Sequence, residues 1–512
     1  MRKIEIGLLK NDPYWETILK QEGVPFEVVS EDLEKYTLLI ANQMLDLGKK
    51  ALVMDYLENG GLVLSFTVFF EENRHVKRVS SFVPSDNKFF KGVSSFSLYG
   101  KTYQIKDESY ENVENIVFSK KVGKGKLILL SFDLSDMLEK LNYSPNPLFT
   151  PSGSVFQILP KVSRNSIRVL IRNCLIDLLN HADLPYVRLS NFPSGFKSAF
   201  VFRVDADNYN EKDFYETIRI LSKHGIKASY FINQSSYTNN LEDLRRLKYL
   251  GFEVQSHMNK HCVYNSVRKN YENLSQSLDF LKEFNPNAFV APFGIFNKSL
   301  LAAAEKLGMV YSSEFSYDYD NLPSFPIVNG RVSKVLQMPI HPVCLESFIE
   351  VGRGDDAILK HFDYTFEKAI KERMPIFWYG HSTRVFRDYP TYFRVFGKMV
   401  GKINKNNGTW KATFSEFYKW WVERLNFSYS VYSDGTGILV KFNRHFAVDL
   451  EIFYKGMFKV SNLRSRIDLK GMRNVQTPVE KERRQYARSF KDILSKLKLY
   501  LLNKYLNYKN MR

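Results

Sequence analysis

The chain has 512 residues, of which 44% are hydrophobic and 15% aromatic, which is enough apolar material for two or three packed domains. This composition excludes an intrinsically disordered polymer. The formal net charge of +18 at pH 7 indicates a partner with negative charge, meaning an anionic membrane face, nucleic acid or an acidic glycan. A generally solubilising basic surface explains the charge equally well.

No run of about eighteen apolar residues is present, so we expect no membrane-spanning helix. Lys10, Asp12 and Glu16 stand where a signal peptide would have its apolar core, so we expect no cleaved leader. The cysteines form no CxxC pair and fit a reducing compartment: they are Cys174, Cys262 and Cys344. We therefore expect a cytoplasmic protein, either free or peripheral at the inner face of the membrane.

Residues 1–135 alternate short apolar runs with helical patterns, which predicts an α/β layer with a mainly parallel sheet. The run "YLENGGLVLSF" (56–66) predicts a helix that ends at Gly60 and Gly61, followed by a buried strand. Together with "VGKGKLILLSFDL" (122–134), it resembles the class I glutamine amidotransferase-like domain. The nucleophilic cysteine of that family has no counterpart here, because the first cysteine is Cys174, so we expect a non-catalytic domain.

Residues 136–195 are predicted to be a connector, with the loop "NYSPNPLFTPSGS" (142–154) before a helix at 164–182. The segment 196–425 again alternates strands and helices, which predicts a second α/β domain. A period-two apolar pattern around an Asp434-Gly435 turn then predicts a hairpin and a small β appendage over 426–470.

The last segment, 478–512, is predicted to be a basic amphipathic helix. Its apolar stripe has helical spacing and consists of Tyr486, Phe490, Ile493, Leu497, Leu501 and Tyr505. Such a helix lies on an anionic membrane surface or packs on its own protein, and the sequence leaves both fates open.

The segment "KSAFVFRVDAD" (197–207) is an apolar run that ends in two acids, Asp205 and Asp207. Chemistry in α/β sheets is placed at the carboxyl ends of strands. The two acids share a face if the strand continues that far, because side chains alternate along a strand. In the alternative, Asp207 only caps the following helix or starts a turn.

Two histidines, His257 and His261, follow another predicted strand. One further predicted strand lies between it and the strand that ends at the two acids. A spacing of four puts both imidazoles on one side of a helical turn, where they can bind one metal. Zinc and similar borderline ions take imidazole nitrogen together with one carboxylate. The position of both pairs after strands predicts that the acids and the histidines form one site.

The order of "RVDAD" (203–207), "GFEVQSHMNKH" (251–261), "FVAPFG" (289–294) and "PIFWYGH" (375–381) resembles the NodB-like polysaccharide deacetylases of carbohydrate esterase family 4. The resemblance covers about residues 198–385, within a domain at 196–425. It implies a distorted (β/α) barrel that removes acetyl groups from glycans with a divalent metal, most suitably zinc, with cobalt, nickel or manganese as alternatives.

The resemblance also assigns roles to residues. Asp205 matches the general base, and Asp207, His257 and His261 match the metal ligands. His381 matches the general acid, with His341 as the second choice. The third motif is "APFG", and a backbone N–H of this motif is expected to help hold the oxyanion. The residues expected to contact the substrate are Pro292, Phe293 and Gly294 of this motif, together with Tyr379 and Arg203.

Two positions depart from the family pattern. Val290 replaces the arginine that usually orients the base, and Arg203, two residues before Asp205 on the same strand, can supply that charge. Met258 replaces the hydroxyl residue that usually follows the first metal histidine. Neither change removes a ligand, so metal binding is a firmer expectation than activity.

The function expected from the resemblance is metal-dependent deacetylation of an acetylated glycan or sugar precursor, with no nucleic acid partner. The alternative is a catalytically impaired metal- and glycan-binding module, or a scaffold in polysaccharide biosynthesis. Four aromatic residues are candidates for stacking on sugar rings, although each also suits a buried core: Tyr209, Phe293, Trp378 and Tyr379.

Overall fold

The computed structural model describes most of residues 1–474, together with Leu497 and Leu501. The residues it leaves undescribed within that range are 31, 71–73, 80–81, 97, 99, 140–142, 151–152, 341–343 and 382–389. The predicted helix at 478–512 therefore lies outside the described residues, apart from Leu497 and Leu501. No helix among the described residues is long and apolar enough to cross a membrane.

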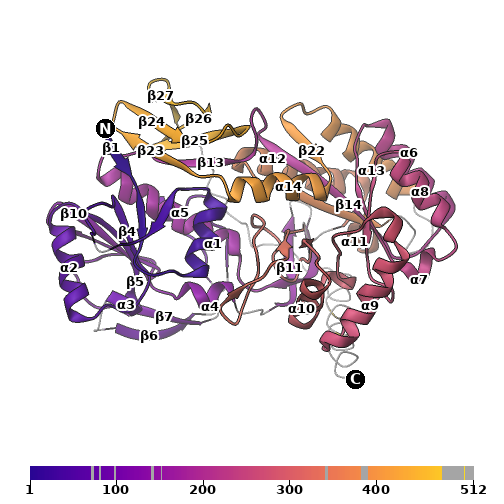
Figure 1. The fold of residues 1–512 in the computed structure, drawn as a ribbon, viewed down its shortest axis with the longest axis horizontal. Helices are drawn as coiled ribbons and strands as arrows, with labels where there is room; N and C mark the ends of the chain where they lie inside the picture. Colours follow the sequence, from indigo (N-terminus) through magenta and orange to yellow (C-terminus); the bar gives the residue numbers. More distant parts are fainter. Residues whose placement is uncertain are drawn as a thin grey trace.

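The N-terminal lobe is built on a seven-stranded sheet in which the first five strands run parallel, as the sequence predicted (Figure 1). In spatial order the strands are β3 (Phe26–Val28), β2 (Ile6–Leu8), β4 (Leu38–Ala41), β5 (Leu62–Phe66), β10 (Gly125–Leu130), β9 (Val117–Val122) and β8 (Glu111–Val113). Its main helices are α1 (Pro13–Glu22), α2 (Leu47–Glu58) and α5 (Arg164–His181).

The alternation of side chains along a strand divides this lobe into two apolar layers. In β4, Leu38 and Ile40 join the core cluster that contains residues of α1 and α5. Leu39 and Ala41 join the cluster that contains residues of α2. Helices therefore cover both faces of the sheet.

The predicted Gly-Gly turn is present between α2 and β5. A Cβ atom at Gly125 would lie 2.2 Å from the carbonyl oxygen of Gly61, so the two backbone segments approach too closely for a larger residue at 125.

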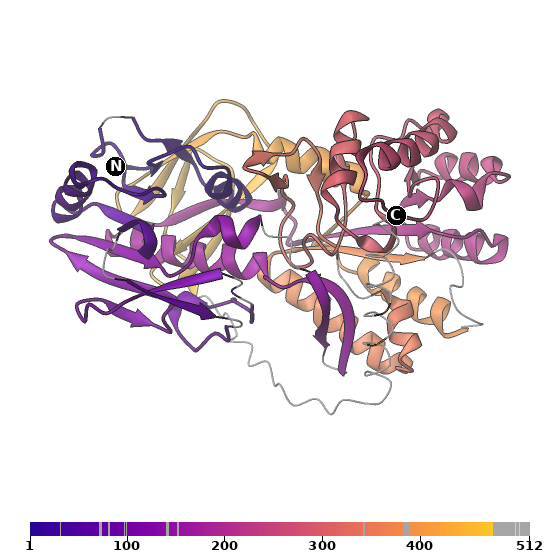
Figure 2. The same ribbon diagram turned by 90° about the horizontal axis from the view of Figure 1, so that it is seen from below.

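The predicted connector loop is a two-stranded antiparallel hairpin, β11 (Tyr143–Thr150) with β12 (Gly153–Pro160). Its end packs on the second lobe, where Ile158 and Leu159 share a core cluster with Tyr379. The prediction of a loop was wrong because the prolines and serines there were interpreted as turn signals, whereas a hairpin with one partner strand tolerates them. Figure 2 shows the hairpin between the two lobes.

The C-terminal strands are not a separate appendage, although the hairpin predicted around Asp434-Gly435 is present. One four-stranded sheet has the order β1 (Arg2–Ile4), β23 (Tyr429–Ser433), β24 (Gly437–Phe442) and β27 (Arg466–Asp468). The other has the order β13 (Tyr186–Pro193), β25 (Val448–Tyr454), β26 (Met457–Asn462) and β28 (Arg473–Asn474). Each sheet takes a strand from an earlier part of the chain.

A buried ion network joins these segments. Glu22, in α1, pairs with Arg168 of α5 and lies 3.0 Å from Arg188 of β13. Arg188 lies 2.6 Å from Glu451 of β25, which also pairs with Arg373. Removing one member of such a network would leave a buried charge unpaired, which is strongly destabilising. The network therefore stabilises the packing of these segments against one another.

The second lobe is an arc of parallel strands with helices outside it. Four strands lie in the order β16 (Glu253–Ser256), β15 (Ser229–Ile232), β14 (Ser198–Ala206) and β21 (Pro375–His381), and β22 (Thr409–Ala412) also pairs with β14. Parallel bridges at Phe289 and Ala288 extend the arc from β16 to β17 (Tyr311–Ser312) and β20 (Leu336–Gln337).

The helices of this lobe match the predicted pattern (Figure 1). They are α6 (Glu211–Lys223), α7 (Gln234–Tyr237), α8 (Leu241–Tyr249), α9 (Val267–Phe280), α10 (Lys298–Lys306), α11 (Leu345–Glu350), α12 (Asp355–Glu372), α13 (Pro390–Asn404) and α14 (Phe414–Leu425). The remaining elements include α3 (Thr67–Phe70), β6 (Arg74–Val79), β7 (Gly100–Ile105), α4 (Leu134–Leu138), β18 (Ile327–Val328) and β19 (Arg331–Val332).

Candidate metal and catalytic site

The carboxyl ends of three parallel strands bring the candidate residues together. Asp205 is the penultimate residue of β14, and its partner in the register with β21 is His381. Asp207 follows the end of β14, and His257 follows the end of β16. Parallel strands end at the same edge of a sheet, so residues from distant parts of the sequence meet there.

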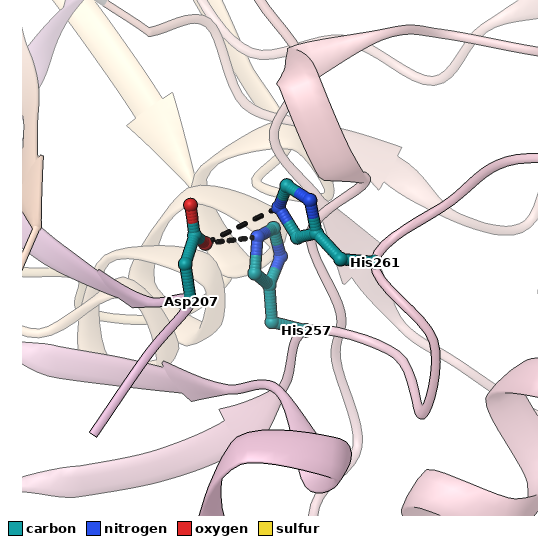
Figure 3. A group of neighbouring side chains, drawn as sticks. All are labelled: Asp207, His257 and His261. Atoms are coloured by element: carbon teal, nitrogen blue, oxygen red, sulfur yellow. Dashed lines mark ion pairs between the residues drawn. The ribbon is translucent and has the colours of Figure 1, made fainter. Parts of the chain in front are cut away.

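Asp207 is the centre of a carboxylate–histidine cluster (Figure 3). Its Oδ1 lies 2.9 Å from Nε2 of His257 and 3.3 Å from Nε2 of His261. Nδ1 of His257 lies 2.9 Å from the carbonyl oxygen of Val290. That hydrogen bond assigns the proton to Nδ1 and leaves Nε2 facing Asp207 as the ligand nitrogen.

The charges at this cluster favour a cation. Burial raises the pKa of Asp207, but hydrogen bonds from His257 and His261 and the charge of His381 hold it well below its usual range. Oδ1 of Asp207 is buried and faces Nε2 of both histidines. One carboxylate and two imidazoles form a donor set suited to zinc and similar ions, so the residues present fit a divalent metal.

The local structure corrects two details of the sequence interpretation. His257 and His261 do not lie on a helical turn, because the chain after β16 is an irregular loop in which Met258 has a φ of 69°. Asn273 of α9 holds this loop, because its Oδ1 accepts from the N–H of Lys260 at 2.7 Å. The capping alternative for Asp207 was also wrong, because the N-cap of α6 is Asn210.

Asp205 forms a two-point ion pair with the fully buried Arg203. Nε of Arg203 lies 2.8 Å from Oδ1 of Asp205, and Nη2 lies 2.9 Å from Oδ2. Nη1 donates to the carbonyl oxygen of Ser313. Val290 belongs to the buried cluster inside the arc of strands, together with Val201 of β14. Arg203, two residues after Val201, faces the same interior.

His381 has a carboxylate partner that the sequence interpretation missed. Oε1 of Glu346, in the first turn of α11, lies 3.1 Å from Nδ1 and 2.9 Å from the backbone nitrogen of His381. Nε2 of His381 faces the cluster, 3.7 Å from Oδ2 of Asp207. Burial lowers the pKa of His381, but Glu346, followed by Asp207 and Asp205, raises it to about 10.

The third-motif segment forms a short 3-10 helix, Pro292–Gly294, beside the cluster. Phe293 has a φ of 58°, is 36% exposed, and packs its ring 4.7 Å from that of His261. Oε1 of the buried Glu314 accepts from the N–H of Ala291 at 2.9 Å and so holds the start of this segment. Pro292 has no N–H, and the N–H of Gly294 donates to the carbonyl oxygen of Ala291, which leaves the N–H of Phe293 as the candidate donor to an oxyanion.

The other aromatic candidates are less available to a sugar. Trp378 is 2% exposed and belongs to the core beneath α12 and α13. Tyr379 is 6% exposed, and the Arg203 guanidinium lies 5.5 Å from its ring. Neither Trp378 nor Tyr379 therefore exposes enough of its ring to stack on a sugar. Tyr209 is partly buried, and its hydroxyl donates to Asp243. His341 lies outside the described residues.

Residues 205–312 match the polysaccharide deacetylase family. No curated protein matches the chain. The domain that carries the site is therefore a polysaccharide deacetylase domain. This match confirms the resemblance to polysaccharide deacetylases that the sequence predicted for about residues 198–385.

Similar solved structures include a putative polysaccharide deacetylase from Mycobacterium smegmatis, with 14% identity, a TM-score of 0.38, and coverage of 44% of this chain and 91% of that chain. A probable polysaccharide deacetylase from Pseudomonas aeruginosa has 12% identity, a TM-score of 0.38, and coverage of 46% and 93%. A CE4 family pseudoenzyme from Bacillus anthracis has 14% identity, a TM-score of 0.30, and coverage of 44% and 66%.

Proposed function

We propose that this protein removes acetyl groups from a glycan or a sugar-containing precursor and that it depends on a divalent metal. The observation that carries the proposal is the position of Asp207, which has two histidine nitrogens within 3.3 Å and a third at 3.7 Å, beside the ion-paired Asp205. A divalent ion held by Asp207, His257 and His261 would supply Lewis acidity toward water and the acetyl carbonyl.

The chain's own residues supply the proton transfers. Asp205 accepts the proton of the attacking water, and Arg203 fixes the orientation of that carboxylate through two contacts. His381 protonates the leaving nitrogen or oxygen from Nε2, while Glu346 holds the opposite side of the ring. A backbone N–H of the segment 292–294 donates to the oxyanion.

The second candidate function is a catalytically impaired module that binds metal and glycan. Val290, in place of the usual arginine, favours it. Arg203 weakens this argument, because its guanidinium pairs with Asp205 from the same interior. The amidotransferase-like character of residues 1–135 stays a prediction.

The test is acetate release from acetylated chito-oligosaccharides by the full chain loaded with about one zinc ion per chain. We expect release by the wild type and none by Asp205→Asn, which keeps the size of the side chain but cannot accept the proton of water. Wild-type protein that holds about one zinc ion per chain and releases no acetate from any acetylated glycan tested would contradict the proposal and favour the binding module.

A further inference from the structure

A second group of side chains with possible metal-ligand atoms includes His381 and lies on the Nδ1 side of its ring. Among the described residues, the candidate ligand atoms of Cys344, Glu346 and His381 all lie within 4.8 Å of one another. Cys344 is the N-cap residue of α11, Glu346 is in the first turn of that helix, and His381 ends β21. A helix start and a strand end thus hold all three side chains in place.

One oxygen of Glu346 has no hydrogen-bond partner among the described residues. Oε1 accepts from both the backbone nitrogen and Nδ1 of His381, but Oε2 is buried and makes no hydrogen bond in the described part of the chain. A buried carboxylate oxygen without a donor is costly, and a cation next to it removes that cost.

Cys344 has no role in the proposed reaction. It is 4% exposed, and its Sγ lies 3.2 Å from Oγ of Ser347. Thiolate, imidazole and carboxylate together are a donor set for zinc and other thiophilic divalent ions. The two groups of ligands are separate except for the ring of His381, which faces Asp207 with Nε2 and Glu346 with Nδ1.

We propose that Cys344, Glu346 and His381 form a second, inhibitory site for a thiophilic divalent ion. Binding there forms bonds from the ion to the thiolate, the carboxylate and Nδ1, and the thiol and Nδ1 protons go to solvent. His381 then keeps only its Nε2 proton and would have to become an imidazolate to donate it, so it no longer acts as a general acid. The inhibitory effect rests on the proposed function, whereas the binding site does not.

The binding test uses Co²⁺ and Zn²⁺ with the full-length protein. Co²⁺ gives an ultraviolet sulfur-to-metal charge-transfer band only when a thiolate is a ligand. We expect this band in the wild type and in Asp207→Ala, which retains the second site, and its loss in Cys344→Ala. By equilibrium dialysis and elemental analysis, the wild type should hold about two zinc ions per chain and each of the two variants about one.

The matched control is Cys174→Ala, which removes another buried cysteine, from α5. It should keep the band and the zinc content of the wild type. If Cys344→Ala fails to fold, the band in the wild type and in Asp207→Ala still decides the proposal. A wild type that binds Co²⁺ without the band, or a band that survives in a folded Cys344→Ala variant, would overturn the second site.

The inhibition test titrates zinc during acetate release. Filling the second site should slow the wild type by about 10²-fold, the contribution expected of a general acid, while Cys344→Ala stays active at the same zinc concentration. Equal inhibition of both proteins would overturn the inhibitory role. A thiolate band in the wild type, together with no acetate release from wild type that carries metal at the first site alone, would instead contradict the proposed function and leave the second ion site supported.

Discussion

Arg203 and Asp205 face the same side of β14 and contact each other at two points, 2.8 Å and 2.9 Å apart. The proposed base, Asp205, is therefore oriented by an arginine of its own strand, whereas Val290 occupies the position at which the family pattern has an arginine. Arg203 is fully buried and its charge is balanced within the site.

Arg203→Met should lower kcat/KM by about 10²-fold, because the carboxylate of Asp205 loses the contacts that hold it in the productive orientation. Zinc content should not change, since Arg203 is not a ligand. Steady-state kinetics and elemental analysis measure both. The informative control is Arg203→Met with Val290→Arg, which returns an arginine to the same interior and should recover part of the activity. Full activity in Arg203→Met alone would contradict a positioning role.

Asp207→Ala and His257→Ala should each lose the metal of the first site, because two remaining ligands bind zinc weakly. Asp205→Asn should keep it. Elemental analysis after removal of free metal distinguishes these outcomes without any activity measurement. Retention of the ion in both ligand variants would show that the ligands were wrongly assigned.

His381→Ala should slow turnover by two to four decades, or about 10²- to 10⁴-fold, because the leaving group then departs without a proton. Glu346→Gln should have a smaller effect, since the amide oxygen can still accept from Nδ1. The two variants are compared by kcat on a soluble acetylated oligosaccharide. A larger loss in Glu346→Gln than in His381→Ala would contradict the assignment of the acid.

The stability of the protein should fall as the pH rises from about 4 to about 7. Burial and the charge of Asp318 raise the pKa of Asp320 to about 7, against an ordinary value of 3.8. Between those values the folded state binds a proton at Asp320 that the unfolded state has released, so this contribution to stability decreases with pH and is constant above the folded pKa.

Asp320→Asn should flatten that decrease, because the amide does not ionise, and urea unfolding at several pH values measures it. Asp356→Asn, at an exposed carboxylate in the first turn of α12, is the control and should leave the slope unchanged. An unchanged slope in Asp320→Asn would show that other groups cause the decrease.

The segment 478–512 should bind anionic vesicles in a salt-dependent manner. Each Lys or Arg near the surface contributes about 1 kcal/mol, and the attraction fades over about 10 Å at 0.1 M salt. The two described residues of its stripe, Leu497 and Leu501, are 52% and 56% exposed. Flotation of the full chain should exceed that of a chain ending at Thr477 on anionic vesicles at low salt, and deacetylation of a soluble substrate should persist after truncation. Unfolding of the truncated chain would favour packing of the stripe on the protein.

The sequence by itself determined the parts of the fold that depend on local periodicity. The apolar run of β4, the Gly-Gly turn before β5 and the hairpin at Asp434-Gly435 each lie within a few consecutive residues, so each can be predicted from a short window. The proximity of Asp205, Asp207 and His257 was also predictable, because each comes at the carboxyl end of a strand and parallel strands end at one edge.

Only the tertiary structure decided which side chains complete the site. Glu346 lies 35 positions before His381 and belongs to a short helix with no motif, so no sequence window links the two. The pairing of β1 with β23 and of β13 with β25 joins segments far apart in sequence, so no short window predicts it. The hairpin β11–β12 packs on the distant second lobe, which its own sequence does not indicate. The second ion site has the same origin, because Cys344 becomes a candidate ligand only where the start of α11 meets the end of β21.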